Sequence, residues 1–314
     1  MMDPRVTQAL AAWDMAGADV TLAARRENTV YRVMADGSEL ALRLHRPGYR
    51  SDAQLRSELQ WMAYLVENGF AVPRPRPARD GALVHTLDGV QVDMLSWLPG
   101  RPLGHGDQID HPDPITLCEN LGAQMARLHD LTDAWQPPEG FDRPDWGAEA
   151  LLGDAPLWGR FWDHPHLTGD QRALLKAARD AARADLDALD PAPDVGLIHA
   201  DLLAENMLID GPEITFIDFD DAAFGYRDFE LATFLLRYVD RPDFLALCAA
   251  LCAGYARRRR VDDGHLDLLL TIRALTYVGW IADRLGEPGT AERSARAIDR
   301  ATRLSRRYLD RRSA

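Results

Sequence analysis

Short apolar runs separated by Asp-Gly pairs characterise residues 20–97. Three such pairs occur, at positions 36–37, 80–81 and 88–89. The first joins Val30–Met34 to Glu39–Leu44, and Asp-Gly between two apolar runs is typical of a β-hairpin. The last apolar run of this region is Val90–Leu95. The first third of the chain is therefore predicted to be mainly β-strand.

One helix interrupts these strands. Ser51 is a helix-capping residue, and apolar residues follow it at helical spacing, namely Leu55, Leu59, Met62 and Val66. Gly69 suits the end of such a helix, and Pro73 prevents its continuation. The pattern predicts a single helix within the strand-rich region.

The pattern becomes helical from Ile115 onward. Ile115–Asp130 and Gly169–Leu189 each read as one helix, and three or four more are expected after Asp228. Leu98-Pro99-Gly100 separates the two patterns, so we place a boundary there, with lobes at 1–97 and 98–314. The expected fold class is α+β, with a small antiparallel-sheet lobe that contains one helix and a larger, mainly helical lobe.

Composition limits the class of protein. The chain has 314 residues, 46% of them hydrophobic and 27% charged, which is enough for a full core. The net charge of −13 argues against nucleic acid as a main partner. We find no apolar stretch of membrane-spanning length and no signal-peptide pattern, and we expect a cytoplasmic protein. Cys118, Cys248 and Cys252 are expected to be core residues.

The strongest chemical signal is the run from His199 to Asn206, followed by Asp218. A hairpin is predicted between its two parts, with Asp210-Gly211 as the turn, so Asn206 and Asp218 should lie at the same end of it. An amide oxygen and a carboxylate placed there suit a hard divalent cation that also keeps phosphate oxygens as ligands. Asp201 is a carboxylate in the preceding loop, placed to deprotonate a hydroxyl. This is the layout of phosphoryl transfer from ATP.

With these residues the chain resembles the protein-kinase-like superfamily, in its aminoglycoside phosphotransferase and choline kinase branch. The resemblance spans roughly residues 25 to 235 and implies a two-lobed fold that uses ATP and Mg²⁺. By the family's pattern Asp201 would be the catalytic base. The implied metal ligands are Asn206, Asp218 and, as a second carboxylate on the same strand end, Asp220. His199 would be a structural residue of the loop, and Asp228 would accept hydrogen bonds from the loop's backbone.

The first lobe carries the implied nucleotide-binding residues. They are Asn28, within the phosphate-covering loop Glu27-Asn28-Thr29, Arg43 on a strand, Glu58 on the helix, and Ser96 and Trp97 at a hinge near Leu95 to Leu98. Arg43 occupies the place of the lysine that pairs with Glu58 and the ATP phosphates. The one lysine of the chain is Lys176, in the second lobe, so an arginine must serve if the chain binds ATP.

A small hydroxyl-bearing acceptor fits the sequence best, such as an aminoglycoside, choline or homoserine-like compound. Only ten residues separate Asp218 from Asp228, too few for a peptide-docking segment, and position 203 is Leu rather than lysine. Two alternatives stay open: a Ser/Thr protein kinase of the bacterial stress-response type, and a non-catalytic ATP-binding pseudokinase. The Trp-rich stretch 135–162 reads equally as a wall of the substrate pocket or as loop packing. Oligomeric state is not predicted.

Overall fold

The computed structural model describes residues 3–25, 28–189 and 193–313. The chain forms two compact units, and each draws on three segments of sequence. Unit 1 comprises Met1–Leu103, Asp130–Arg143 and Glu205–Asp220, and unit 2 comprises Gly104–His129, Pro144–Ala204 and Asp221–Ala314.

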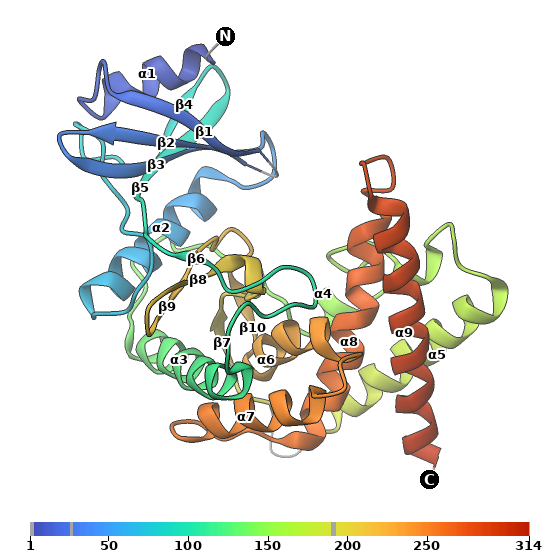
Figure 1. The fold of residues 1–314 in the computed structure, drawn as a ribbon. Helices are drawn as coiled ribbons and strands as arrows, with labels where there is room; N and C mark the ends of the chain where they lie inside the picture. Colours follow the sequence, from blue (N-terminus) through green and yellow to red (C-terminus); the bar gives the residue numbers. More distant parts are fainter. Residues whose placement is uncertain (1–2, 26–27, 190–192, 314) are drawn as a thin grey trace. The chain divides into compact units, whose positions relative to one another are not determined.

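A five-stranded antiparallel sheet dominates unit 1, as predicted (Figure 1). Its strands, in the spatial order β1-β2-β3-β5-β4, are β1 (Asp19–Arg25), β2 (Thr29–Ala35), β3 (Ser38–Leu44), β5 (Val90–Ser96) and β4 (His85–Leu87). The predicted helix is α2 (Asp52–Glu67), which Ser51 and Gln54 cap reciprocally. The structure also has a helix that the sequence analysis does not predict, α1 (Pro4–Ala12), capped by Asp3.

The two faces of the sheet differ in chemistry because side chains alternate along a strand. Leu40, Leu42 and Leu44 of β3 belong to an apolar core that also contains residues of α1. Arg43 lies between these leucines in sequence, so its side chain emerges on the opposite face, where Glu58 of α2 meets it. The alternation of side chains along β3 therefore places Leu40, Leu42 and Leu44 in the core and leaves Arg43 on the face where it can take part in chemistry.

Unit 1 also contains a three-stranded antiparallel sheet, in the order β6-β8-β9. Its strands are β6 (Arg101–Pro102), β8 (Met207–Asp210) and β9 (Glu213–Phe216), and Gly211 lies in the β8–β9 turn with a positive φ. Met207 pairs with Phe216, and the carbonyl of Asn206 accepts the Ile217 N–H at 3.0 Å. This hairpin confirms the arrangement predicted between Asn206 and Asp218.

Unit 2 is mainly helical, as predicted. Its elements are α3 (Pro114–Ala134, with the residues up to His129 in this unit), α4 (Ala148–Leu152), η1 (Phe161–Asp163), α5 (Gly169–Asp187), α6 (Arg227–Leu235), η3 (Leu236–Tyr238), α7 (Phe244–Ala256), α8 (Asp263–Ala282) and α9 (Thr290–Ser313). A short antiparallel pair, β7 (Val195–Ile198) with β10 (Ala223–Tyr226), flanks the 3-10 turn η2 (Ala204–Asn206) in sequence. Across the described residues, no helix is both long and apolar enough to cross a membrane.

Helices α3 and α7 approach each other through glycine. A Cβ atom built on Gly122 of α3 would lie 2.0 Å from the carbonyl oxygen of Leu251, and one built on Gly254 of α7 would lie 1.8 Å from that of Glu119. Both obstacles are backbone atoms, which cannot move aside as a flexible side chain can. The close contact of these helices therefore requires both glycines.

We predict that Gly122→Ala destabilises the protein, because the added methyl group forces the two helix backbones apart. Overpacking of this kind costs typically about 1–3 kcal/mol, and we expect the upper end of that range, with a fall in Tm of about 5 °C or more. Gly169→Ala at the start of α5 is the matched control, since its Cβ meets nothing within 4 Å. Equal Tm values for the two variants in differential scanning calorimetry would contradict the close-packing account.

Candidate active site

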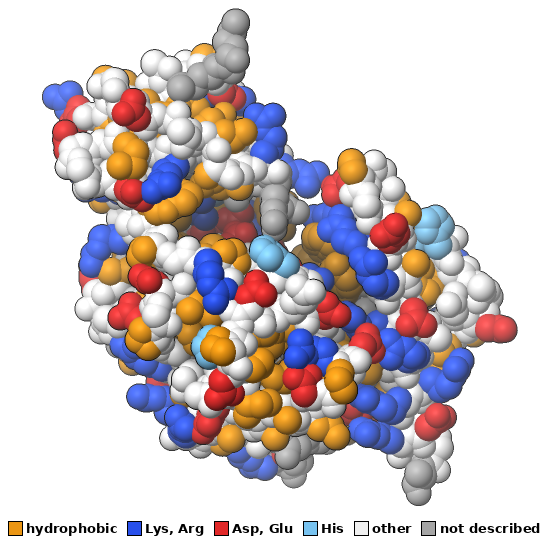
Figure 2. All heavy atoms as spheres, viewed as in Figure 1, with side chains coloured by type: hydrophobic (Ala, Val, Ile, Leu, Met, Phe, Trp, Pro, Cys, Tyr) orange, Lys and Arg blue, Asp and Glu red, His pale blue; other side chains and the backbone are white. Residues whose placement is uncertain are grey.

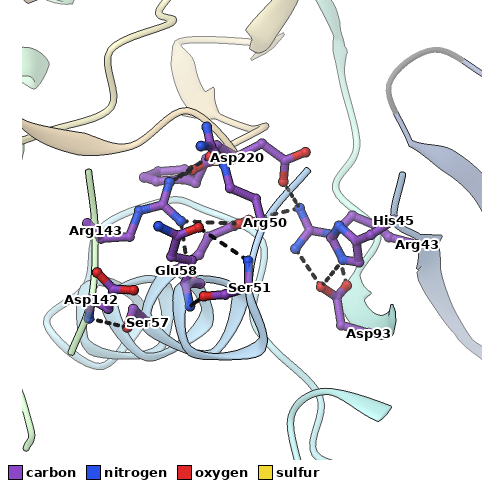
Figure 3. Close-up of polar contacts among 12 residues, drawn as sticks. Arg43, His45, Arg50, Ser51, Ser57, Glu58, Asp93, Asp142, Arg143 and Asp220 are labelled. Carbon is purple, nitrogen blue, oxygen red and sulfur yellow. Dashed lines mark hydrogen bonds and ion pairs between the residues drawn. The ribbon is translucent and has the colours of Figure 1, made fainter. Parts of the chain in front are cut away.

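Arg43 is the centre of a buried cluster of charges in unit 1 (Figure 3). Its Nη1 donates to Glu58 at 2.9 Å, so the structure brings together the two residues that the sequence analysis paired. Its Nε and Nη2 donate to the two oxygens of Asp93 at 2.8 and 2.7 Å, and Nη1 also lies 3.4 Å from Asp220. One guanidinium thus joins three carboxylates from β5, α2 and the segment after β9.

Asp93 is the main residue that the sequence analysis missed. It stands directly opposite Arg43 in the pairing of β3 with β5, so the two side chains share one face of the sheet. Its carboxylate also contacts His45 Nε2 at 2.8 Å. The signal was a single carboxylate within the apolar run Val92-Asp93-Met94, which is costly to bury without a cation.

The charges in this cluster nearly balance. Three carboxylates, those of Glu58, Asp93 and Asp220, meet the guanidiniums of Arg43 and Arg143. His45 adds a further positive charge when protonated: burial alone would lower its pKa, but Asp93 outweighs burial and raises it. Burial likewise works against the charge on Arg43, yet its acidic neighbours hold its pKa well above the usual value. The pKa of Glu58 is raised, because burial outweighs its cationic neighbours.

The segment that carries Asp220 is tied down at several points. Its carboxylate accepts from the Asn28 side chain, and its backbone carbonyl accepts from Arg50 Nε at 3.0 Å and Arg143 Nη2 at 2.6 Å. Asn28 also accepts the backbone N–H of Arg46 at 3.3 Å. These contacts give Asn28 and Asp220 a place in the ion-pair cluster, and metal binding by Asp220 stays a prediction. Glu27, beside Asn28, lies outside the described residues.

Ser96 and Trp97 end β5, at the predicted hinge. Ser96 exchanges backbone and side-chain hydrogen bonds with Arg74, and the Trp97 N–H donates to the Glu39 carbonyl at 3.0 Å. The Arg32 guanidinium lies 5.1 Å from the centre of the Trp97 ring. These contacts fix the backbone at the hinge, and nucleotide binding by Ser96 and Trp97 stays a prediction.

Asn206 and Asp218 both lie at the base of the β8–β9 hairpin, where the Ile217 N–H donates to the Asn206 carbonyl. Asn206 is buried, and Asp218 has a left-handed backbone with φ of 67°, which a non-glycine residue adopts only when its surroundings enforce it. Among the described residues there is no group of three or more His, Cys, Asp or Glu side chains that could hold a metal.

Asp201 lies in unit 2, on a loop whose backbone Glu230 organises. The Glu230 carboxylate accepts the backbone N–H of His199 and that of Ala200, each at 2.8 Å. Ala200 has a left-handed φ of 70°, and the His199 ring is buried with its Nδ1 3.4 Å from the Asp201 N–H. This loop presents Asp201 with its side chain partly exposed.

The sequence analysis assigned the contact with this loop to Asp228, and the structure corrects that assignment. Glu230, two residues further along α6, accepts both N–H groups. Burial, with Asp194 and Asp262 nearby, raises the pKa of Asp228 to about 6. Helical geometry explains the difference, because positions two apart on a helix face different directions and only one of them can point at the loop.

Glu230 belongs to a buried chain of polar groups. His129 of α3 lies between Glu230, at 3.4 Å, and the Tyr255 hydroxyl, at 2.7 Å. Burial lowers the pKa of His129 well below its usual value, so its imidazole is neutral. Burial raises the pKa of Glu230 to about 7 despite its two backbone donors. The acid that holds the backbone of the Asp201 loop thus has a pKa near neutrality.

Known proteins that resemble this chain belong to the class that the Arg43 cluster and the Asp201 loop indicate, namely the kinases. The model of the phosphotransferase enzyme family matches residues 20–264. A homoserine kinase of Pseudomonas aeruginosa is 31% identical over 264 residues, which cover 82% of this chain and 77% of that protein. The structure of a microcompartment-associated aminopropanol kinase superposes with a TM-score of 0.85 at 30% identity, covering 98% of this chain and 97% of that one. An amicoumacin kinase structure, at 21% identity and a TM-score of 0.74, shares the fold.

The chain belongs to the phosphotransferase enzyme family. Its fold is the protein-kinase-like fold of these relatives, which confirms the resemblance drawn from the catalytic motif. Its activity class is that of a kinase acting on a hydroxyl group of a small molecule.

We predict strong energetic coupling between Arg43 and Asp93. Removing one partner of a buried ion pair leaves an uncompensated charge and costs about 3–5 kcal/mol. The free energies of unfolding lost in Arg43→Met and in Asp93→Leu should therefore add up to much more than the loss in the double variant. We expect a coupling free energy above about 1.5 kcal/mol in denaturant unfolding. The exposed pair Arg32 and Glu39, at 2.6 Å in the same sheet, is the control and should couple by less than about 1 kcal/mol. Equal coupling for both pairs would refute the account.

A second prediction concerns Glu230 and pH. Because the folded pKa of about 7 lies above the usual glutamate pKa of 4.5, the folded state binds the proton more tightly, and this carboxylate costs stability as pH rises from about 4.5 to 7. Glu230→Gln removes the titration but leaves one loop N–H without its acceptor. We expect the variant to be less stable at pH 5, with a flatter dependence of Tm between pH 5 and 7.5. Parallel Tm curves for variant and parent would contradict this.

Proposed function

We propose that the protein transfers the γ-phosphate of ATP, with Mg²⁺, to the hydroxyl of a small molecule. The observation that supports this best is the buried ion pair of Arg43 with Glu58, at 2.9 Å. Family members place a cation for the ATP phosphates there, and in this chain an arginine with three carboxylate neighbours is held in that position. We also propose a cytoplasmic location.

In this proposal Arg43 binds the nucleotide by exchanging Asp220, the most distant of its three carboxylate partners, for a phosphate oxygen. Its bonds to Asp93 and Glu58 are 2.7–2.9 Å, whereas Asp220 is 3.4 Å away. A guanidinium has five N–H donors, so a phosphate oxygen can replace Asp220 while Asp93 keeps the plane of the group fixed. Asn28 and Arg50 hold the rest of the Asp220 segment during that exchange.

Asn206 and Asp218 would hold Mg²⁺. They offer one amide oxygen and one carboxylate, which suits a hard cation that takes its remaining ligands from phosphate and water. The metal would neutralise charge on the transferring phosphoryl group. Asp201 accepts the proton of the attacking hydroxyl, and the strained Ala200, with Glu230 behind it, holds that carboxylate in position.

The proposal makes distinct predictions for two carboxylates. Asp201→Asn removes the base but no metal ligand, so we expect kcat to fall by about 10² or more with little change in Mg²⁺-ATP affinity. Asp218→Asn should instead weaken Mg²⁺-dependent binding of a non-hydrolysable ATP analogue. Asp210→Asn, on an exposed residue at the hairpin turn, is the matched control and should change neither.

Steady-state kinetics with labelled ATP and calorimetric nucleotide binding separate the outcomes. Binding of nucleotide without turnover of any acceptor, small molecule or protein, would favour a pseudokinase. Turnover of generic protein substrates in preference to aminoglycosides, choline and homoserine would favour a protein kinase. Wild-type turnover in Asp201→Asn would refute the role of Asp201.

A further inference from the structure

Arg273 of α8 is a buried cation beside the proposed catalytic base. Its side chain is 8% exposed, and its Nη2 lies 3.5 Å from Asp201 Oδ1. The guanidinium packs 4.9 Å from the centre of the Trp158 ring and 5.9 Å from that of Phe229. All four residues belong to unit 2. Neither the family pattern in the sequence nor the proposed mechanism gives this arginine a role.

The contact with Asp201 does not satisfy this guanidinium. An N–H···O hydrogen bond spans about 2.7–3.2 Å, and a guanidinium carries five donors. Over the described part of the chain, Asp201 provides the one carboxylate within ion-pair distance of Arg273. Arg43, by contrast, is equally buried but donates to three carboxylates. Since a buried charge is costly without good partners, Arg273 is built to receive another anion.

A purely structural pairing with Asp201 would also oppose catalysis. A cation next to a general base stabilises its ionised form and lowers its affinity for the proton it must accept. This cost is reduced when a second anion shares the guanidinium. An acceptor that brings its own negative group would therefore both satisfy Arg273 and restore the basicity of Asp201.

The neighbouring charges favour an acceptor that carries a negative group over a polycationic one. Arg237 stacks over Tyr277, 5.5 Å from the ring centre, and Tyr277 stacks in turn on Trp280. Arg237 and Asp221 act electrostatically on Arg273 along with Asp201. Figure 2 shows basic side chains over the α8 and α9 region of unit 2, and these two helices contain arginine but no lysine. A polycationic acceptor would be repelled by Arg237 and Arg273, whereas a hydroxy acid would be attracted.

We propose that the acceptor is a small hydroxyl compound with a carboxylate, such as a hydroxy amino acid, and that Arg273 binds this carboxylate. The inference rests on the proposed function. In the reaction the hydroxyl oxygen forms a bond to the γ-phosphorus, the bond from that phosphorus to ADP breaks, and the hydroxyl proton goes to Asp201. Arg273 takes no part in these bond changes and acts by binding and orienting the acceptor.

The test uses acceptors that differ only in the carboxylate. L-Homoserine is compared with 3-aminopropan-1-ol, and L-threonine with 1-aminopropan-2-ol. A charge-assisted hydrogen bond corresponds to roughly a 10- to 100-fold preference, so we expect kcat/KM for at least one carboxylated member to exceed that of its partner by about this factor. The preference should appear in KM for the acceptor, because the carboxylate is bound in the ground state, and also in kcat, because the bound carboxylate restores the basicity of Asp201.

Variants connect this preference to Arg273. In Arg273→Gln the ratio within the pair should fall to within about threefold, and Arg273→Lys, which keeps the charge but loses the fork, should give an intermediate ratio. Arg284→Gln is the matched control, because it removes another arginine stacked on a tryptophan, and its ratio should equal that of the parent. Thermal unfolding and binding of an ATP analogue show that each variant is folded.

The possible results separate this inference from the proposed function. Equal use of both members, preference for the amino alcohol, or an unchanged ratio in Arg273→Gln would overturn the role of Arg273. Turnover of choline or aminoglycosides with no turnover of any carboxylated acceptor would do the same while leaving the kinase activity established. If no acceptor at all is phosphorylated, both the role of Arg273 and the proposed function are overturned.

Discussion

The burial of an arginine in the face of a β-sheet is the constraint on which unit 1 depends. Arg43 cannot lose its charge, so every element around it must supply an oxygen: β5 supplies Asp93, α2 supplies Glu58, and the segment after β9 supplies Asp220. A lysine has three donors on a single nitrogen and would need fewer partners. In this chain Asp93 binds two further nitrogens of Arg43, and Asp93 in turn raises the pKa of His45. One residue type accounts for most of the polar architecture of this face.

Backbone strain marks both halves of the proposed chemistry. Ala200 and Asp218 have left-handed φ angles. Ala200 precedes Asp201, the proposed base, and Asp218 is itself a proposed metal ligand. Strain of this kind persists only where surrounding contacts over-determine the backbone. Around Ala200 those contacts come from Glu230, which is held within a buried chain that includes neutral His129. The interior of unit 2 thus maintains the geometry of a loop whose proposed catalytic side chain, Asp201, is partly exposed.

Sequence patterns predicted the parts of the structure that local chemistry determines. The Asp-Gly turns, the Ser51 cap, the change from strands to helices and the pair Arg43–Glu58 all depend on short-range rules or on one motif. The helix α1 was missed although it begins with local signals, the Asp3 cap and Pro4. Asp93 and Glu230 were missed for a different reason. Asp93 acquires its partner through the register of β3 with β5, and Glu230 reaches a loop 30 residues earlier in the chain. Such contacts depend on tertiary pairing, which propensity and spacing do not encode.

Two buried arginines, Arg43 of unit 1 and Arg273 of unit 2, show how burial and partner geometry together indicate function. Arg43 has carboxylates at hydrogen-bonding distance on two edges of its guanidinium, so contacts within the protein offset most of the free energy that burying this charge costs. Arg273 has an aromatic surround and one carboxylate at 3.5 Å. The first arrangement is that of a residue fixed before any ligand arrives, and a ligand gains from it a preorganised charge. The second is that of a residue whose full set of partners includes the ligand. In a family whose members act on different acceptors, a residue of the second kind is where specificity can differ while the catalytic loop stays the same.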